Sequence, residues 1–475
     1  MALLAAAGGC AVPTKGDLGK QRAAAATQPT IMPALIPPDG LNADMAHLFE
    51  TIEQTHINPY AFTSKADFAR LRKAAMARIG QPMTREQLYW VAAPLVASLK
   101  NGHTFVYPPT ERLKRHLAKG GRYCPLELDC DGRKALLAGY PHLEKRLVGA
   151  TVLSINGADA GRALRRYARC FPAEGKAANY PVLRRLLPAM LWLDRGAEPV
   201  KLRVKTADGK IRAVTLSPVT KEQAEAGATV AGSRAKRYTF RYLADRGVGL
   251  IEFNSFSGRK AFGKFLQETF TTLRDKKAAG LVIDLRRNPG GNSALGDMLL
   301  GYLTDKPFAQ FSQFQVKVSA LLRKQQAPMV KVARQLSEGA EPRDGQVFSH
   351  RLPEKKPADN PLRFGGNVCV LISRATSSAA VSLASTVKHY KLATVIGRET
   401  GDATSSYGDS LSFTLPNSKL RVGVACKHFV CAGSAEDGRG VLPDHEVAQS
   451  PADAAKGVDT ALQFTLDLIA KSSGE

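Results

Sequence analysis

The most restrictive feature of the sequence is a short, almost wholly apolar run at residues 280–285, Gly-Leu-Val-Ile-Asp-Leu, which leads into a turn with two adjacent glycines. Such a run, without alternation of polar and apolar residues, predicts a strand that is buried on both faces, as in a parallel sheet covered by helices. The flanking sequence alternates between strand-like and helix-like patterns, with strands expected at 248–253, 368–372 and 393–396 and helices at 264–273, 295–303 and 379–390. This alternation predicts an α/β layered core.

The sequence before this core divides into two further modules. Apolar residues at helical spacing between positions 44 and 99 predict a small helical module, and Thr84 with Gln87 forms a capping-box pattern at the start of its third helix. Short strand-like runs between 120 and 218, with one helical stretch, predict a module of mixed composition. We therefore expect four parts: a leading segment and linker at 1–39, the helical module at 40–110, the second module at 120–218 and the core at 237–470.

Two stretches do not fit these patterns. Residues 219–236 are polar and rich in Ala and Gly, which indicates a linker between the second module and the core. Residues 311–360 are charged and poorly periodic, so we expect an excursion from the core there.

Three loops carry residues that could perform chemistry. In residues 286–292, Gly290 and Gly291 would leave backbone N–H groups bare beside the start of a helix, an arrangement that favours developing negative charge. Ser378 lies between a buried strand and a helix that opens with small residues; a serine there is ordinarily a helix cap, but the same pattern makes a nucleophile elbow. His103 follows Asn101-Gly102, where it is either a surface turn residue or the base that a serine nucleophile needs.

Together these loops resemble the C-terminal-processing (tail-specific) family of serine peptidases, in the branch that is similar to the tricorn protease core and the interphotoreceptor retinoid-binding modules. The resemblance extends from about Asp44 to Ile469. It rests on seven segments, at 56–60, 99–104, 147–157, 282–291, 376–380, 397–401 and 440–444. Asn101 stands where the family usually has Asp in its Asp-Gly-His-Thr segment.

The resemblance implies a fold. The core would be a crotonase-like (ClpP/crotonase) α/β catalytic domain, preceded by the N-terminal helical module and by a PDZ-like module at 120–218. The active site would lie where these parts meet.

It also implies residue roles. Ser378 would be the nucleophile and His103 its base, and the N–H groups of Ala379 and of Gly290 or Gly291 would form the oxyanion hole. Members with a Ser-Lys dyad carry the lysine after the Gly-x-x-Thr segment, where this chain has residues 402–404, Asp-Ala-Thr. The Ser-His branch is therefore implied, and its third, acidic catalytic residue would be Asp437 or, as the alternative, Glu436.

The reaction expected from this reading is hydrolysis of peptide bonds in a peptide or protein substrate, without a cofactor or metal. Two rival hypotheses remain open: a non-catalytic binding protein for apolar ligands or peptides on the same fold, and acyl-CoA chemistry on a crotonase-like core. A net charge of +25 would attract anionic partners, but the basic residues are scattered and no nucleic-acid-binding motif occurs. We expect no nucleic-acid partner.

The N-terminal segment predicts export. A short apolar stretch runs into Cys10 and is followed by a segment rich in Pro, Gly, Lys and Ala, which resembles the end of a bacterial lipoprotein signal. We therefore expect an exported, periplasmic or membrane-anchored bacterial lipoprotein with a lipid on Cys10. In an oxidising compartment, Cys124 with Cys130 or Cys426 with Cys431 would be suitable pairs for local disulfides.

Expression in a Gram-negative host tests the lipid anchor. The wild-type protein is expected in the membrane fraction, and Cys10→Ser is expected in the soluble fraction because it has no thiol to carry the lipid. A Cys10→Ser protein that remains equally membrane-bound would contradict lipidation at this residue.

Overall fold

The computed structural model describes residues 34–130, 134–174, 179–227, 236–450, 453 and 457–472. The expected lipidation residue, Cys10, lies outside them. No helix within these ranges is both long enough and apolar enough to span a membrane.

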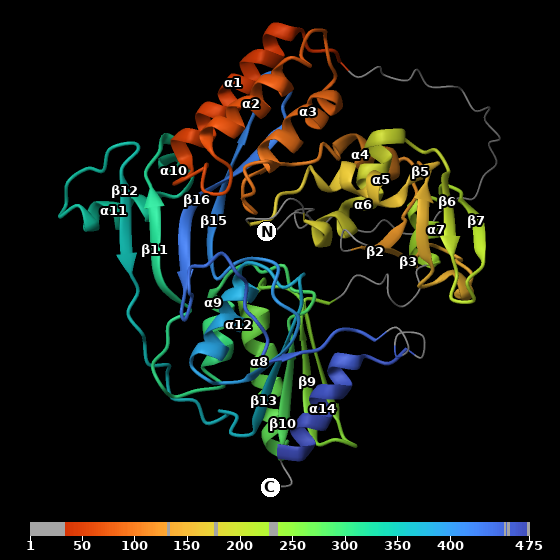
Figure 1. The fold of residues 1–475 in the computed structure, drawn as a ribbon. Helices are drawn as coiled ribbons and strands as arrows, with labels where there is room; N and C mark the ends of the chain where they lie inside the picture. Colours follow the sequence, from red (N-terminus) through yellow and green to blue (C-terminus); the bar gives the residue numbers. More distant parts are fainter. Residues whose placement is uncertain are drawn as a thin grey trace, which may run out of the picture.

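A six-stranded sheet forms the core, as the alternating sequence pattern predicts. Its order is β17-β14-β13-β10-β9-β8. The strands β17, β14, β13, β10 and β9 are parallel, and β8 is antiparallel to β9. The strands are β8 (Tyr238–Leu243), β9 (Val248–Phe253), β10 (Gly280–Asp284), β13 (Asn367–Ile372), β14 (Thr394–Gly397) and β17 (His445–Glu446). Helices lie on both faces of this sheet (Figure 1): α8 (Arg259–Asp275), α9 (Ala294–Leu300), α12 (Ala379–His389) and α14 (Thr460–Ser472).

The apolar run in β10 explains why both faces are covered. Leu281 and Ile283 pack into the apolar cluster shared with α8, α9 and α12, whereas Val282, pointing the other way, packs into the cluster shared with α14. Successive strand residues point to opposite faces, so an uninterrupted apolar strand needs a helix layer on each side.

The second module is built on an antiparallel sheet of order β2-β3-β4-β6-β7, with β5 paired to β4. Its strands are β2 (Glu127–Cys130), β3 (Ala135–Gly139), β4 (Thr151–Ile155), β5 (Ala158–Asp159), β6 (Val200–Lys205) and β7 (Ile211–Leu216). A short 3₁₀ turn at Lys145–Leu147 and the helices α5 (Ala160–Ala168) and α6 (Tyr180–Arg195) belong to this part, and α7 (Lys221–Ala226) follows it.

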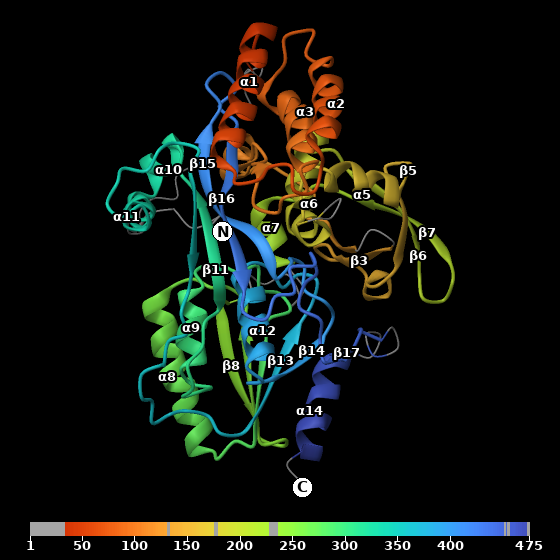
Figure 2. The same cartoon turned by 60° about the vertical axis from the view of Figure 1, so that its left-hand side comes forward.

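A third sheet joins the N-terminal module to the core, as Figures 1 and 2 show. Its order is β1-β16-β11-β12, with β15 also paired to β16. The strands are β1 (Phe105–Val106), β11 (Phe311–Lys317), β12 (Val347–Arg351), β15 (Ser405–Thr414) and β16 (Arg421–Cys431). The stretch 311–360 thus leaves the parallel sheet, as expected, but it also supplies two strands and the helices α10 (Ala320–Gln325) and α11 (Ala327–Leu336). Periodicity missed β11 because its partner β16 lies more than one hundred residues further along the chain.

The N-terminal module consists of α1 (Pro38–Thr55), α2 (Lys65–Met76) and α3 (Arg85–Ala97), and α4 (Glu111–Ala118) follows and packs against α6. The predicted capping box of Thr84 and Gln87 is confirmed at the start of α3. Helix α1 packs on β16, and the fully buried Asp44 fixes this contact. Its Oδ1 accepts the N–H of Asn417 at 2.8 Å and its Oδ2 accepts that of Ser418 at 2.7 Å.

The expected disulfides are absent from the described residues. Cys426 and Cys431 are both buried free thiols in the single strand β16. Five residues of strand separate their Cα atoms by about 16 Å, far beyond the reach of a disulfide. Cys124 is a buried free thiol too, so the other suggested pairing also fails.

Two buried polar side chains near the loop that follows α3, His56 and Asn101, leave hydrogen-bond donors unsatisfied among the described residues. Burial lowers the pKa of His56 to about 3, and the side chain of Asn101 lies beside its ring. Nδ1 of this neutral ring accepts the N–H of Asn58 at 3.0 Å, so its single proton is on Nε2. Asn101 Oδ1 accepts the N–H of His103 at 3.2 Å, and within the described residues the buried Nε2 of His56 and the buried Nδ2 of Asn101 have no partner at hydrogen-bond distance. Turning the amide over would only place its NH₂ against the N–H of His103.

We therefore expect Asn101→Asp to stabilise the protein. An aspartate offers two acceptors, one for the N–H of His103 and one for Nε2–H of His56, and satisfying a buried donor is worth about 1–3 kcal/mol. The free energy of unfolding, measured by urea denaturation, should rise, and the pKa of His56 should rise with it. The isosteric Asn101→Leu is the control and should lower stability, because it removes the acceptor of the His103 N–H. An Asn101→Asp protein less stable than wild type would refute this account of the two donors.

Candidate active site

Ser378 occupies a strained turn between β13 and α12. Its backbone angles are φ 54° and ψ −125°, a region that residues with a side chain rarely adopt. The following residues, Ala379 and Ala380, are small and buried, so helix α12 can approach closely. Strand, tight turn and helix thus form the elbow that the sequence predicts around this serine.

Asn288 holds the glycine loop against this turn. Its side chain is fully buried, its Nδ2 donates to the carbonyl of Phe253 at 2.7 Å, and its Oδ1 accepts the N–H of Gly290 at 2.8 Å. Its backbone carbonyl accepts the N–H of Ser377 at 3.0 Å. One side chain and its backbone therefore join the end of β9, the glycine loop and the serine turn.

The two glycines are required by close approach and by backbone shape. Gly290 has φ +91°, and a Cβ there would lie 2.7 Å from Cβ of Ser378 and 2.8 Å from the N of Ala379. Gly291 has φ +140°, and a Cβ there would lie 2.4 Å from the carbonyl oxygen of Phe256. The N–H of Gly290 is used by Asn288, whereas those of Gly291 and Ala379 donate to no acceptor among the described residues. These two amides are the ones available to a bound oxyanion.

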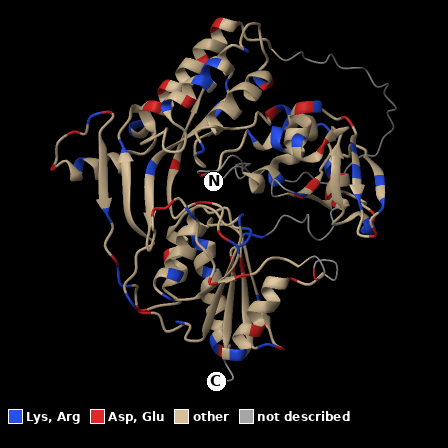
Figure 3. Cartoon of the chain, viewed as in Figure 1, with Lys and Arg blue, Asp and Glu red and all other residues tan. Residues whose placement is uncertain are grey.

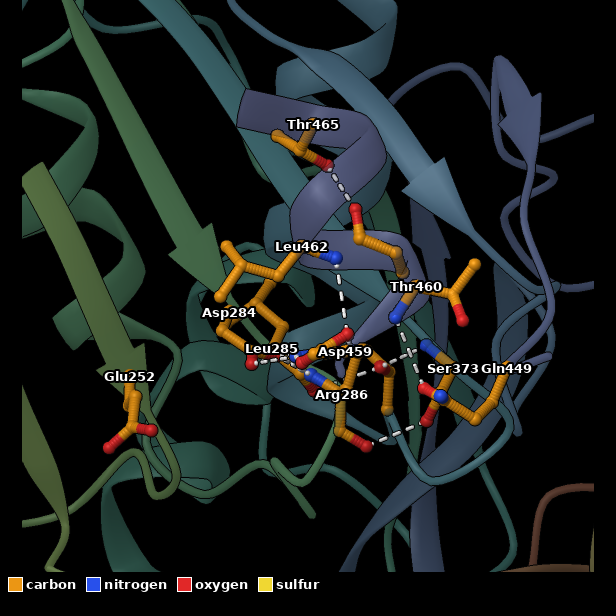
Figure 4. A network of polar contacts seen from close by, with 12 residues as sticks. Glu252, Asp284, Leu285, Arg286, Ser373, Gln449, Asp459, Thr460, Leu462 and Thr465 are labelled. Carbon is orange, nitrogen blue, oxygen red and sulfur yellow. Dashed lines mark hydrogen bonds and ion pairs between the residues drawn. The ribbon is translucent and has the colours of Figure 1, made fainter. Parts of the chain in front are cut away.

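The base of the glycine loop is fixed by a charged network (Figure 4). The Arg286 guanidinium donates to Asp284 and to Asp459, which precedes α14, at 2.6 to 3.0 Å. The hydroxyl of Ser373 donates to the carbonyl of Arg286 at 2.6 Å, and that of Thr376 to the carbonyl of Leu285 at 2.9 Å. The ends of β10 and β13 are thereby locked together.

The His103 loop is anchored on the third sheet. The hydroxyl of Ser410 on β15 donates to the carbonyl of His103 at 2.6 Å, and the N–H of Ala425 on β16 donates to Oγ1 of Thr104 at 3.1 Å. Strand β1 continues directly from this loop and pairs with β16. The loop is therefore held between the helical module and the core.

The imidazole of His103 is in a partly desolvated setting. Burial lowers its pKa, while the charge of Asp402, the charge of Asp409 and the backbone of Tyr407 act in the opposite direction. Nδ1 is buried and has no hydrogen-bond partner among the described residues, and no described hydrogen bond joins the ring to Ser378. A neutral imidazole in such a site can accept a proton.

Asp402 lies between His103 and Ser378. It is 4% exposed, and its Oδ2 accepts the N–H of Ser378 at 2.7 Å and the hydroxyl of Ser377. Its other oxygen faces Gly102, whose Cβ, were one present, would lie 3.8 Å away. From the sequence alone, Asp402 stands out only because it lies where Ser-Lys members carry their lysine. Its position directly after the Gly-x-x-Thr-Gly segment is the sequence feature that could have marked it as a site residue.

The acidic residues suggested beside His103 lie elsewhere. Asp437 is exposed and accepts the N–H of Arg439 at 2.9 Å within a turn, and no described contact joins it to the imidazole. Glu436 is exposed too, and its charge acts on His428 rather than on His103. Neither of the two positions considered for a dyad lysine supplies a base to Ser378. Ala403 is buried at the dyad position, and Nζ of Lys419 donates to the carbonyl of Pro416.

Within the ranges that the structure describes, there is neither a metal-binding cluster nor a region in which basic side chains are concentrated. The described residues contain no cluster of three or more His, Cys, Asp or Glu side chains that could hold a metal ion. Lys and Arg are distributed over all the modules and are interspersed with Asp and Glu (Figure 3).

Comparison with known proteins identifies the core. Residues 247–447 match peptidase family S41. No curated protein sequence matches the chain with statistical significance.

Several solved structures are similar to this chain. Mature CPAF complexed with lactacystin is similar with a TM-score of 0.63 and 15% identity, over 91% of this chain and 98% of that one. A putative peptidase from Parabacteroides merdae gives a TM-score of 0.50 and 15% identity, over 91% and 97% of the two chains. The photosystem II D1 C-terminal processing protease gives 0.46 and 17%, again over 91% and 97%. The mixed α/β fold with several sheets is thus shared with the first two of these structures, and residues 247–447 belong to peptidase family S41, the C-terminal-processing serine peptidases.

Proposed function

We propose that this serine peptidase cleaves peptide bonds with Ser378 as nucleophile and His103 as general base. Peptidases of this family act on peptides or proteins, and no cofactor is needed for the chemistry proposed. The observation that carries the assignment is Asp402, which holds the turn of Ser378 by a 2.7 Å hydrogen bond and acts electrostatically on His103.

The proposed steps use groups already in place. His103 takes the proton of the Ser378 hydroxyl as the oxygen attacks the substrate carbonyl, and the N–H groups of Gly291 and Ala379 hold the oxyanion that forms. The imidazolium then gives its proton to the leaving amine, and water repeats the sequence on the acyl-enzyme. A hydrogen bond between imidazole and serine that forms only with substrate bound is common in such enzymes.

We assign the acidic role to Asp402 rather than to Asp437 or Glu436. A carboxylate near the imidazole stabilises the imidazolium that forms in the transition state. Asp402 is buried and its charge raises the pKa of His103, whereas the other two carboxylates are exposed and have no described contact with the ring.

The finer architecture belongs to the same proposal. The parallel sheet with helices on both faces supports a crotonase-like core, and the antiparallel sheet with α5 and α6 supports a PDZ-like module at 120–218. Export with a lipid on Cys10 stays a prediction from the sequence.

Labelling with a fluorophosphonate probe tests the nucleophile. The wild-type protein should be labelled on Ser378 because an activated serine attacks phosphorus as it attacks a carbonyl, and Ser378→Ala should not be labelled. Ser377→Ala is the matched control: it removes the adjacent hydroxyl, which donates to Asp402, and should retain labelling. Labelling of Ser377 instead would overturn the assignment of Ser378, and no labelling of the wild-type protein would favour a binding protein on this fold.

The pH dependence of kcat/KM tests the base. Only the neutral imidazole accepts a proton, so activity should fall as pH drops through the pKa of His103, and burial places that acid limb below the ordinary 6.5. Asp402→Asn removes the charge that raises this pKa, so its limb should lie at still lower pH. His103→Ala should lower kcat about 10³-fold or more, whereas Lys419→Ala should change it little. A limb that does not move in Asp402→Asn would exclude the acidic role of that residue.

A further inference from the structure

A carboxylate from the second module reaches the His103 loop. Glu174 lies between α5 and α6 and is 2% exposed. Its Oε2 accepts the N–H of Gly102 at 2.9 Å, and its Oε1 accepts the N–H of Tyr407 on β15 at 3.0 Å. One side chain thus binds the helical module and the third sheet at once.

Both partners of Glu174 adjoin the imidazole. Gly102 immediately precedes His103 in the chain, and the backbone of Tyr407 interacts with the ring itself. Fixing these two N–H groups therefore fixes the main chain on two sides of the ring. No described contact of Glu174 reaches Ser378 directly, and both of its hydrogen bonds go to main chain that adjoins His103.

Burial at this position disfavours the ionised form of the Glu174 carboxyl group. Burial raises the pKa of Glu174 to about 8, the two N–H groups lower it, and the charge of the neighbouring Asp402 raises it further. No described salt bridge or hydrogen bond supplies a cation in compensation. A buried carboxyl that is not paired with a cation needs another reason to be there, and two otherwise unsatisfied backbone N–H groups provide one.

We propose that Glu174 is a positioning residue for His103, which holds the base in register with Ser378 from the second module. This inference rests on the proposed function and deepens it. It makes Glu174, which follows α5 in the second module, part of the active-site framework, although that module is built on a separate sheet.

The ionisation of Glu174 gives this role a pH signature. The titratable groups that interact electrostatically with it are Asp402 and Tyr407. Below about pH 8 the carboxyl is neutral; above it, the carboxylate holds both N–H groups more firmly and so fixes the main chain beside the imidazole. Wild-type kcat/KM should therefore show a second rise near pH 8, above the acid limb of His103.

Glu174→Gln is the central experiment. Glutamine keeps the size of the side chain but replaces one acceptor by an NH₂ donor, which faces either the N–H of Gly102 or that of Tyr407. We expect kcat to fall about 10- to 100-fold with KM nearly unchanged, fluorophosphonate labelling of Ser378 to slow by a similar factor, and the rise near pH 8 to disappear. The control is Glu225→Gln on α7, an exposed carboxylate that pairs with Lys221 and should leave every one of these values unchanged.

The outcomes separate the two proposals. If Ser378→Ala and His103→Ala abolish activity while Glu174→Gln keeps wild-type kcat and pH profile, the positioning role is wrong and the proposed function stands. If Ser378→Ala remains active, the proposed function itself fails. If Glu174→Gln does not fold, the wild-type profile decides, because the absence of a rise near pH 8 would overturn the role of Glu174.

Discussion

The amide of Asn288 is the contact on which the arrangement of the active site depends. Fully buried and hydrogen-bonded through both Nδ2 and Oδ1, it ties the end of β9 to the glycine loop, and the backbone carbonyl of Asn288 ties that loop to the turn before Ser378. Buried polar groups held by hydrogen bonds of this kind are rigid and tolerate few substitutes. The strained backbone of Ser378 persists because the residues around it are fixed in this way.

The sequence predicts the structure best where the local residue pattern and burial agree. The unbroken apolar run of β10 predicted a two-sided sheet, and both glycines after it are needed, one against Ser378 and one against Phe256. The turn of Ser378 was also readable from the strand before it and the small residues after it. These features depend on neighbours in the chain or on the single sheet that the pattern defines.

Prediction failed where the necessary partner lies far along the chain. Nothing in the sequence near Glu174 indicates that its carboxyl meets Gly102 and Tyr407, which are separated from it by 72 and 233 residues. The resemblance implied Asp437 or Glu436 as the acidic residue, whereas we propose Asp402, whose buried carboxylate acts on the pKa of His103. The suggested pairing of Cys426 with Cys431 failed for the opposite reason. The two residues are close in sequence, but the extended strand β16 holds them too far apart in space for a disulfide.

The anchorage of α1 on the β15–β16 pair has a consequence for how this chain is made. Asp44 finds its two main-chain partners only at residues 417 and 418, and β1, which continues from the His103 loop, pairs only with β16. On the ribosome, the helices at the N-terminus emerge early but lack the surface that buries them until nearly the whole chain has been synthesised. The loop that carries His103 gains its supports at the same late moment, so a nascent or truncated chain would hold Ser378 without an ordered base. Late assembly of this kind would keep a peptidase inactive during its own synthesis without any inhibitory segment.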